Sequence, residues 1–483
     1  MKKALSLIAL LVLALPCWAT SYYISPSGSD AANGTSTGTP WLSPNHALNC
    51  GDVIQAAAGT YSRDNFQTGK WGVVTCVAAN NVAWLKCAVF DTCYIADYTG
   101  YVLGSMYVDK SYWGVQGWEI TNGTAAYDAC FGAFPNSASP VEIHHIIFAN
   151  NIANGCSQGA FVSANNGTAS IDYLAIIGNI GYNASQASTN CASGISVYQP
   201  VVSDPLPGTH IYIAGNFMWH NVDGNPCAGG SPMDGEGITL DTLSGVNTVG
   251  LTPYTGQAAV VNNIMVFNGN AGFSTGGGGS SLAPIFLRNN TMYGNFIDSH
   301  INASICGQSN LEGFPADSTH SINLVQEWLD LAMPSGATEP ACGSNPAYAF
   351  YAYNATASDH VFQDFGYSAA GNNTAVVSST GFSFGPNNTF GVNPNFANPI
   401  EPAAPSCSGK ASTVDCMGTV IANFTPTNAA AKAYGYQAVS TTSRYDPMYP
   451  QWLCSVTNLP TGLVTPGCVV AGSSTASGTG SMK

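Results

Sequence analysis

Two short patterns, each typical of a β-strand, alternate along the chain in one fixed order. One pattern begins at glycine and continues with alternating apolar and polar residues: GAFVSA at 159, GISVYQ at 194, GITLDT at 237 and GFSTGG at 272. The other is an apolar run that ends at an asparagine, and the aligned asparagines are Asn151, Asn179, Asn216, Asn263 and Asn290. Each repeat therefore supplies two strands in the same order.

The aligned asparagines are separated by 28, 37, 47 and 27 residues. Constant strands with variable spacing indicate a coil of fixed size that carries loop insertions. A solenoid of parallel strands meets this requirement, because its coils stack and asparagines at the bends can form hydrogen-bonded ladders. An antiparallel sandwich with Asn-Gly turns is the alternative, but it does not explain the fixed order of the two strand types. A further asparagine follows in most copies, at Asn183, Asn221, Asn268 and Asn295.

Other segments carry a resemblance to a known group of proteins. They are YYISPSGSD, GTPW and ALNCGDVIQAAAGTYS within 22–62, VDKSYWGVQGWEITNG (108–123), TFGVNPNFANP (389–399) and FTPTNAAAKAYGYQ (424–437). Together they resemble secreted right-handed parallel β-helix proteins of the pectate-lyase-like superfamily, over roughly residues 22–440. In that group a strand and a short helix cap the coil, and segments like the last two form closing rungs. The resemblance implies a fold and says little about activity.

The predicted fold class is all-β: a right-handed parallel β-helix solenoid with an N-terminal cap and long loop insertions, stapled by disulfides. We expect a signal peptide at 1–19, one β-helix domain at 20–455 and a C-terminal segment at 456–483 with a flexible low-complexity tail. Within the domain the cap is expected at 20–62, central coils at 100–300, and C-terminal coils with a short helical insertion at 300–455. SINLVQEWLDLA (321–332) is the segment with a helical pattern.

The N-terminal sequence MKKALSLIALLVLALPCWA has the two lysines, apolar run and small residues of a secretory signal peptide, cleaved near Ala19. No later apolar run reaches the ~18–20 residues that cross a bilayer, so we expect an extracellular or periplasmic protein without membrane insertion. Without Lys2 and Lys3 the chain has nine Lys and Arg against 26 Asp and Glu, a net charge of −17. This balance argues against nucleic acid as a partner, because nucleic-acid binding needs clustered cations.

Fourteen cysteines remain after Cys17 is removed, an even number that favours disulfides in an oxidising compartment. The metal alternative is weak, because the sequence has no CxxC motif and no cluster of cysteine with histidine. Many cysteines are sequence neighbours, which predicts local staples: Cys87 with Cys93, Cys130 with Cys156, Cys191 with Cys227, Cys306 with Cys342, Cys407 with Cys416, and Cys454 with Cys468.

The stretch MDGEGITLDT (233–242) places three carboxyl groups within eight residues. Because side chains alternate along a strand, Ile238 and Leu240 are expected in the core, and Thr239 and Asp241 on the outer face. Asp234 and Glu236 precede the strand, at a bend where a long loop enters. The outward row is expected to continue through Ser196, Tyr198 and Ser274 and, on the other side, Phe161 and Ser163.

Long loops surround this stretch, so we expect a substrate groove on the coils of residues 190–290. Carboxylates can act in acid–base chemistry and aromatic rings can stack on sugars, and these properties set the expected roles. The candidate catalytic residues are Asp241, Glu236 and Asp223, and the candidate substrate-binding residues are Tyr198, Trp219, His220 and Arg288. Carboxylates of two neighbouring loops also match a calcium site, with Asp223, Asp234 and Glu236 as ligands.

Three functions are open at this point. A glycoside hydrolase needs a pair of carboxyl groups, which these acids can supply. The resemblance suggests lyase activity, which needs a cation to neutralise the carboxylate of an acidic sugar. Arg288 is the only Lys or Arg between 111 and 409, so calcium would have to supply that positive charge. His220 or Tyr198 would then be the base. A non-catalytic, adhesin-like rod is the third, since Asp-Gly pairs are also ordinary turn residues. We expect an extracellular polysaccharide partner, neutral or weakly charged, that the protein binds and cleaves.

Overall fold

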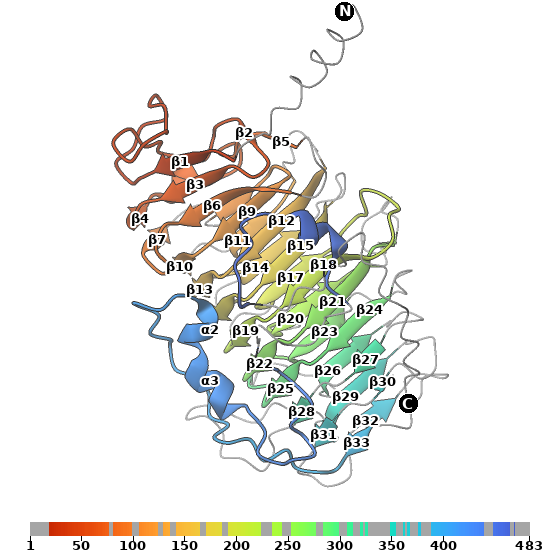
Figure 1. The fold of residues 1–483 in the computed structure, drawn as a ribbon. Coiled ribbons are helices and arrows are strands. Elements are labelled where there is room, and N and C mark those ends of the chain that lie inside the picture. Colours follow the sequence, from red (N-terminus) through yellow and green to blue (C-terminus); the bar gives the residue numbers. More distant parts are fainter. Residues whose placement is uncertain are drawn as a thin grey trace, which may run out of the picture.

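Parallel strands form three long sheets that wind around one axis. The computed structural model describes residues 19–298 except for residues 77–80, 99–105, 124–128, 136–141, 165–170, 186–191, 224–233, 244–252 and 277–283. It also describes the strands between 307 and 377, and residues 388–438, 448–463 and 468. Each strand pairs in parallel with its equivalents one coil earlier and one coil later (Figure 1). The chain is therefore a right-handed parallel β-helix, and the predicted fold class is confirmed.

Sheet A has 11 strands. They are β1 (Ser21–Ile24), β3 (Val53–Ala56), β6 (Ala83–Cys87), β9 (Trp113–Gln116), β12 (Ile143–Ala149), β15 (Ile171–Ile177), β18 (Thr209–Ala214), β21 (Gln257–Val261), β24 (Ile285–Arg288), β27 (Thr319–Ser321) and β30 (Val361–Phe362). The two-stranded sheet B pairs β2 (Leu48–Asn49) with β5 (Val74–Thr75), and the short helix η1 (Arg63–Asn65) lies between them in sequence.

Sheet C has 11 strands and sheet D has nine. The strands of sheet C are β4 (Gly59–Tyr61), β7 (Cys93–Tyr98), β10 (Trp118–Gly123), β13 (Ile152–Asn154), β16 (Ile180–Tyr182), β19 (Phe217–Trp219), β22 (Ile264–Val266), β25 (Thr291–Tyr293), β28 (Leu324–Gln326), β31 (Phe365–Tyr367) and β33 (Thr389–Phe390). The strands of sheet D are β8 (Met106–Val108), β11 (Ala129–Ala133), β14 (Gly159–Ala164), β17 (Ile195–Tyr198), β20 (Ile238–Asp241), β23 (Phe273–Gly276), β26 (Gly307–Glu312), β29 (Tyr348–Tyr353) and β32 (Ala375–Val377).

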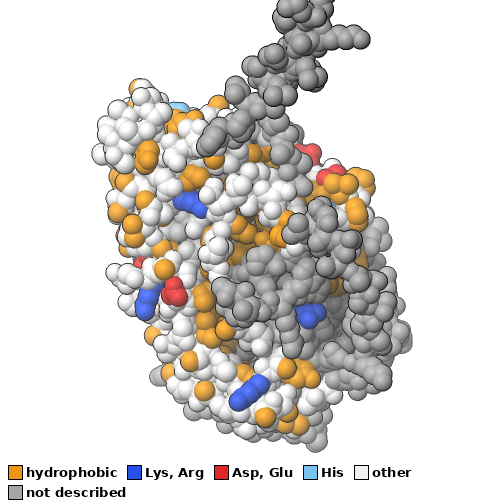
Figure 2. Space-filling view, viewed as in Figure 1, with side chains coloured by type: hydrophobic (Ala, Val, Ile, Leu, Met, Phe, Trp, Pro, Cys, Tyr) orange, Lys and Arg blue, Asp and Glu red, His pale blue; other side chains and the backbone are white. Residues whose placement is uncertain are grey.

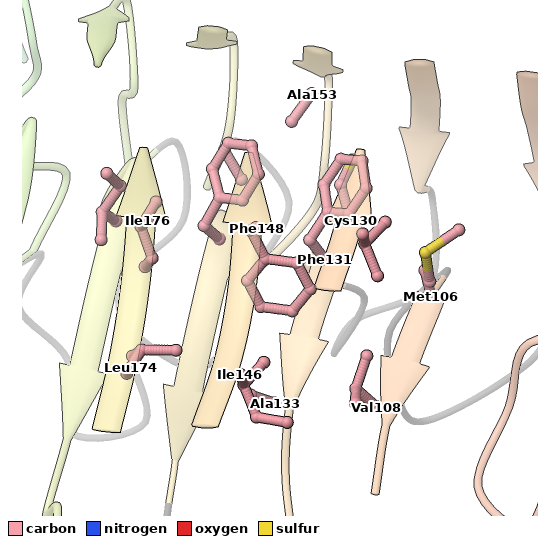
Figure 3. Close-up of a cluster of buried hydrophobic side chains, with 14 of the residues drawn as sticks. Met106, Val108, Cys130, Phe131, Ala133, Ile146, Phe148, Ala153, Leu174 and Ile176 are labelled. Carbon is pink, nitrogen blue, oxygen red and sulfur yellow. The ribbon is translucent and has the colours of Figure 1, made fainter. Parts of the chain in front are cut away.

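The core is a column of apolar rows, one residue per coil in each row. Phe148, Ile176 and Ile213 form such a row on sheet A, and each contacts its equivalent in the next coil. Figure 3 shows neighbouring rows that face one another across the interior. Full burial of one such side chain contributes about 1.5–3 kcal/mol. The alternation of apolar residues in the sequence is therefore the pattern that closes the coil.

Asparagine ladders hold the bend between sheets A and C. Asn151, Asn179, Asn216, Asn263 and Asn290 are buried, and each Nδ2 donates to the Oδ1 of the next, at 2.9–3.2 Å. The same Nδ2 also donates to a backbone carbonyl, and the Oδ1 accepts a backbone amide, as at Asn216. This predicted ladder is confirmed.

A second ladder joins Asn221, Asn268 and Asn295. Asn183, which the sequence aligns with these three asparagines, does not belong to this ladder. Because Tyr182 pairs with Trp219, Ala184 takes the position opposite Asn221, and the side chain of Asn183 donates instead to Asn154. The bend from Asn179 to Asn183 is one residue shorter than the bend from Asn216 to Asn221, and this difference places Asn183 outside the ladder.

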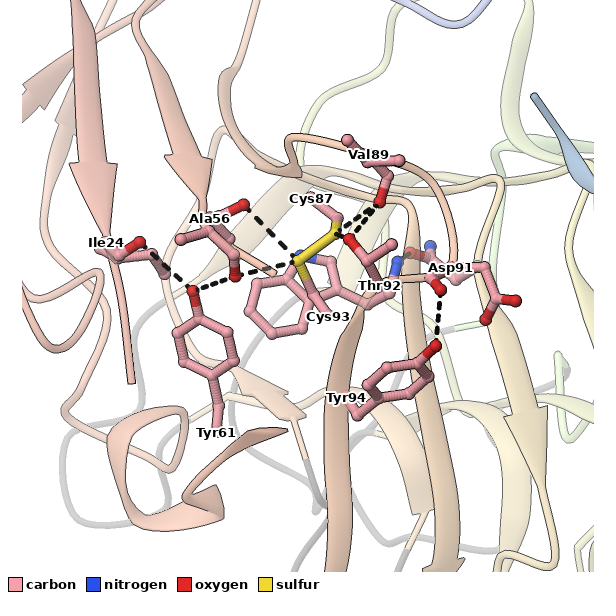
Figure 4. The surroundings of a disulfide bond; sticks show 12 residues. Ile24, Ala56, Tyr61, Cys87, Val89, Asp91, Thr92, Cys93 and Tyr94 are labelled. Carbon is pink, nitrogen blue, oxygen red and sulfur yellow. Dashed lines mark hydrogen bonds between the residues drawn. A yellow bond between two sulfur atoms is a disulfide. The ribbon is translucent and has the colours of Figure 1, made fainter. Parts of the chain in front are cut away.

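Disulfides tie neighbouring coils and bends. The predicted pairs Cys87–Cys93, Cys130–Cys156, Cys407–Cys416 and Cys454–Cys468 are confirmed, and Cys50–Cys76 is a fifth. Cys191, Cys227, Cys306 and Cys342 lie outside the described residues. Figure 4 shows Cys87–Cys93 at the bend between β6 and β7, where the Tyr61 hydroxyl donates to the carbonyls of Ala57 and Ile24.

After β33 the chain returns along the outside of the helix. Residues 396–436, with α2 (Thr413–Cys416) and α3 (Gly418–Asn423), pack on the outer face of sheet C. Residues 449–463, with η2 (Gln451–Ser455), pack on the outer face of sheet A (Figure 1). We call residues 396–463 the C-terminal strap.

The strap replaces the expected closing rungs at 424–437. Outward positions of sheets A and C are apolar, as at Ile180, Phe217 and Ile264, so their burial against the strap is favourable. In the described part of residues 300–455, helical structure is in α2, α3 and η2. The prediction of a helix at 321–332 is wrong for Ser321 and Leu324–Gln326, which lie in β27 and β28; the other residues of that segment lie outside the described part. The domain boundaries stay a prediction.

The predicted signal peptide lies almost wholly at residues 1–18, outside the described part of the chain. Where the structure describes the chain, it contains no helix with the length and apolar character needed to cross a membrane.

Replacing Asn216 by alanine should lower the free energy of unfolding by about 3–5 kcal/mol, because several buried hydrogen bonds of the ladder lose a partner. Urea unfolding measures the loss. Asn45→Ala, at an exposed position, is the control and should change stability little. Equal stability of the two variants would show that the ladder contributes nothing.

Candidate functional site

The register of β20 places its side chains as the alternation predicts. Ile238 and Leu240 are fully buried and align with Ile195 and Val197 in the core. Thr239 and Asp241 face outward and align with Ser196 and Tyr198, and Ser274 lies opposite Thr239 in the next coil.

The expected continuation of this row through Phe161 and Ser163 is wrong by one residue. Phe161 pairs with Ile195 and lies in the core, so Val162 and Ala164 occupy the outward row. The cause is one additional residue, Ala160, between the glycine of this coil and its first core residue.

Four acids from three segments interact beside β20. Asp223 follows β19, Asp234 and Glu236 precede β20, and Asp241 ends it. The negative charges of Asp223, Glu236 and Asp241 all act on Asp234. A tight bend at Gly235 (φ +93°) allows this approach, because a Cβ there would lie 3.1 Å from the backbone nitrogen of Asp223. The structure thus brings together Asp223, Asp234, Glu236 and Asp241, which we call the acid cluster.

Glu236 is the buried centre of the acid cluster, with 4% of its surface exposed. Its Oε2 accepts from the Ser193 hydroxyl at 2.7 Å, and its Oε1 accepts from Asn270 Nδ2 at 3.1 Å. Burial raises the pKa of Glu236 to about 7, against hydrogen bonds from Ser193 and Thr239 that lower it. Near neutral pH this carboxyl is therefore shared between its protonated and ionised forms.

Asp234 and Asp241 differ in how firmly they hold a proton. Burial, and then the charges of the other three acids, raise the pKa of Asp234 well above its ordinary value. Burial also raises the pKa of Asp241, but the hydroxyl of Thr242, which donates to Oδ1 at 2.8 Å, opposes the rise. The arrangement can therefore hold one protonated and one ionised carboxyl group at the same time.

Tyr198 lies next to Asp241 on the outer face of sheet D, and its side chain is half-buried. Gln199 Nε2 donates to the Tyr198 hydroxyl at 2.9 Å and fixes the ring. Burial and the charge of Asp241 raise the pKa of Tyr198, so the phenol stays neutral at physiological pH. A neutral, fixed ring beside a carboxylate is suited to stacking on a sugar.

The structure places Trp219, His220 and Arg288 away from Tyr198 and Asp241. Trp219 is 2% exposed, because it stacks on Tyr182 at 4.6 Å beneath the strap. His220 pairs with Glu401 of the strap. Arg288 ends β24 on sheet A, in the row of Val261 and the smaller apolar residues of earlier coils.

The calcium prediction named Asp223, Asp234 and Glu236. Among the residues that the structure describes, no three His, Cys, Asp or Glu side chains are grouped in a way that could hold a metal ion. Hydroxyl and amide groups of Ser193, Thr239 and Asn270 surround Glu236 instead.

Ser193 and Asn270 are site residues that the sequence reasoning missed. A signal for Ser193 existed: it directly precedes Gly194 as Glu236 precedes Gly237, so the two residues are equivalent in adjacent coils. Asn270 had no such signal, because its role depends on the fold of the bend around Gly235. The backbone N–H of Asn270 donates to the carbonyl of Gly235 in that bend.

A second polar network, also missed, lies on sheet A. His210 Nδ1 donates to both oxygens of Asp172 at 3.0 Å, and Nε2 donates to the carbonyl of Leu206 at 2.8 Å. Tyr254 and Ser203 also donate to Asp172. Burial opposes both charges, but these hydrogen bonds outweigh it, lowering the pKa of Asp172 and raising that of His210. A buried ion pair therefore fastens the loop 201–208 to the sheet.

Comparison with known proteins gives a likeness of architecture. No family model matches the chain, and no curated protein matches it. Pectate lyase Pel9A is 15% identical over 88% of this chain and 90% of its own, with a TM-score of 0.35. A lacto-N-biosidase from Eubacterium ramulus is 12% identical over 77% and 68%, with a TM-score of 0.39. A rhamnogalacturonan lyase is 14% identical over 82% and 97%, with a TM-score of 0.36.

Glu236→Gln should flatten the dependence of stability on pH. Because the folded pKa of about 7 lies above the ordinary value of 4.5, the wild-type protein should lose stability as pH rises between these values, by roughly 3 kcal/mol. Urea unfolding at several pH values measures the slope. Glu142→Gln, at an exposed position, should keep the wild-type dependence of stability on pH. The same dependence in Glu236→Gln would contradict a raised pKa at Glu236.

Asp172→Asn should lower the free energy of unfolding by about 3–5 kcal/mol, because it leaves His210 buried without its counter-charge. NMR titration of His210 should show its pKa falling below that of the wild type. Asp64→Asn, at an exposed position, is the matched control. A His210 pKa that does not fall would show that Asp172 does not hold the charge.

At these identities and TM-scores the solved structures carry no conclusion about activity or substrate. The chain's own parallel sheets establish the architecture, which is a right-handed parallel β-helix.

Proposed function

We propose that this chain is a secreted protein that binds and cleaves a neutral polysaccharide, in the manner of a glycoside hydrolase, at the acid cluster. The observation that carries the proposal is the meeting of Asp223, Asp234, Glu236 and Asp241, with the pKa raised in three of them. Buried carboxyl groups that raise one another's pKa cost stability, and such groups concentrate at functional sites. A rod without activity has no need of them.

The proposed roles follow from the protonation of each acid. Asp234, whose pKa burial and the neighbouring charges raise well above its ordinary value, donates a proton to the glycosidic oxygen as general acid. Asp241, half-buried at the end of β20, supplies the carboxylate that attacks the sugar or activates a water. Asp223 and Glu236 hold the pKa of Asp234 high through their charges, and Ser193 and Asn270 position Glu236.

The proposed substrate is neutral because the chain is strongly acidic. A net charge of −15 over the full chain repels acidic polymers at low salt. Arg288 lies on sheet A, whereas Asp241 lies on sheet D, so Arg288 is not placed to neutralise a uronate beside the acid cluster. Tyr198 offers the ring on which a sugar unit stacks.

Secretion is part of the proposal. Five disulfides in the described part of the chain form and persist in an oxidising compartment. The polysaccharide partner of this proposal is accordingly an extracellular one.

Asp241→Asn should reduce the release of new reducing ends from a responsive polysaccharide by roughly 10²–10⁴-fold, because the ionised carboxylate is lost. A panel of neutral and acidic polysaccharides, assayed with and without a calcium chelator, gives the measurement. Asp64→Asn is the control and should keep full activity. Ultraviolet-absorbing unsaturated products would mean a lyase, and no product from any polymer would favour the rod.

Asp234→Asn should distinguish the role of Asp234 as proton donor from the role of Asp241 as carboxylate. Its activity on polysaccharide should fall like that of Asp241→Asn, but on aryl glycosides with good leaving groups the loss should be much smaller, since these need little proton donation. Equal losses on both substrates would contradict the role of Asp234 as general acid.

A further inference from the structure

A cavity of about 390 Å³ lies on the outer face of sheet A, away from the acid cluster. Its walls come from the loop 206–208, from β18, β21 and β24, and from residues 448–452 of the strap. The volume falls in the lower part of the ~300–1,000 Å³ range of small-molecule sites. We call it the sheet A cavity.

The cavity lies where a ladder of stacked rings ends. Tyr112, His145, Tyr173 and His210 stack in successive coils, with centroids 5.0, 4.5 and 4.1 Å apart. Between β18 and β21 the register jumps, so that Thr209 pairs with Gln257 and Ile211 with Ala258. His210 is thus the additional residue of a β-bulge, and the next coil has no residue opposite it. His210, Thr209 and Gln257 line the sheet A cavity at this end of the ladder.

Aromatic side chains and neutral polar groups line the sheet A cavity. Tyr173, Phe286, Tyr449 and Trp452 supply the rings. The one cationic side chain in the lining, His210, has both nitrogens engaged by Asp172 and Leu206, and the Tyr173 hydroxyl donates to Asp204. The lining therefore presents to a ligand a surface that carries no unpaired charge.

Three polar groups in the lining lack a hydrogen-bond partner in the part of the chain that the structure describes. They are the hydroxyl of Thr209 (8% exposed), the amide of the half-buried Gln257, and the indole N–H of Trp452 (4% exposed). A buried polar group without a partner costs about 1–3 kcal/mol, and a ligand that supplies the missing bonds recovers it.

We propose that the sheet A cavity binds one ring of a neutral sugar. The apolar C–H face of a sugar ring packs on aromatic side chains, and its hydroxyls both donate and accept, as Thr209 and Gln257 require. The carboxylates of Asp172 and Asp204 behind the wall disfavour an anionic sugar. The site lies on a different sheet from the acid cluster, so the inference goes beyond the proposed cleavage and is tested separately from it.

The test uses the full chain and the methyl glycosides of glucose, galactose, mannose, xylose and N-acetylglucosamine. Saturation-transfer NMR identifies a binder, and calorimetry gives its affinity. Thr209→Val and Gln257→Ala should each weaken binding on the order of tenfold, the loss of about one hydrogen bond. Thr60→Val, an exposed strand position on β4, and Asp241→Asn should leave the affinity unchanged. Thermal unfolding confirms that each variant is folded.

The proposal is overturned if no glycoside of the panel binds, or if Thr209→Val and Gln257→Ala bind as the wild type does. Binding of indole that the glycosides fail to displace would mean an apolar ligand and would also overturn it. Loss of binding in Asp241→Asn would place the sugar at the acid cluster instead. Cleavage lost in Asp241→Asn with glycoside binding retained would support two separate sites.

Discussion

The structure depends on the hydrogen bonds that pair each strand with its equivalent in the next coil. This pairing fixes the register, so outside the bulge at His210 each strand side chain lies above the side chain at the same position one coil earlier. Apolar positions then become continuous rows, and asparagines at the bend become ladders. The register also sets the position of the functional groups, because Asp241 lies beside Tyr198, and Glu236 beside Ser193, for the same reason.

The features that repeat in the sequence are those that it predicts well. Alternation placed Ile238 and Leu240 in the core and Asp241 outside, and the aligned asparagines gave one ladder correctly. Where one coil departs from the repeat by a single residue, prediction was wrong. Ala160 shifts Phe161 into the core, and the bend after β16 moves Asn183 out of its ladder.

Contacts between distant segments were beyond what the sequence showed. The strap contacts coils that are distant in sequence: the backbone amide of Thr413, for example, donates to the side chain of Asn150, 263 positions earlier. No local pattern encodes such an arrangement. The strap is also why Trp219, a plausible sugar platform by type, is buried. The pairing of Asp172 with His210 likewise required two coils to be stacked in register. Of the acid cluster, the sequence identified the carboxyl groups but not the amide and hydroxyl groups around them.

The strap has a consequence for the order of assembly. The coils are synthesised first and can stack as they emerge, since each needs only its neighbour. In the described part of the chain, residues 396–438 and 448–463 cover the apolar outer rows of sheets A and C, and these residues follow the coils in sequence. The Trp84 indole, for example, donates to the carbonyl of Thr457, 373 positions later. A chain caught midway through synthesis therefore displays two apolar surfaces that favour aggregation, and these surfaces stay uncovered until the strap has been made.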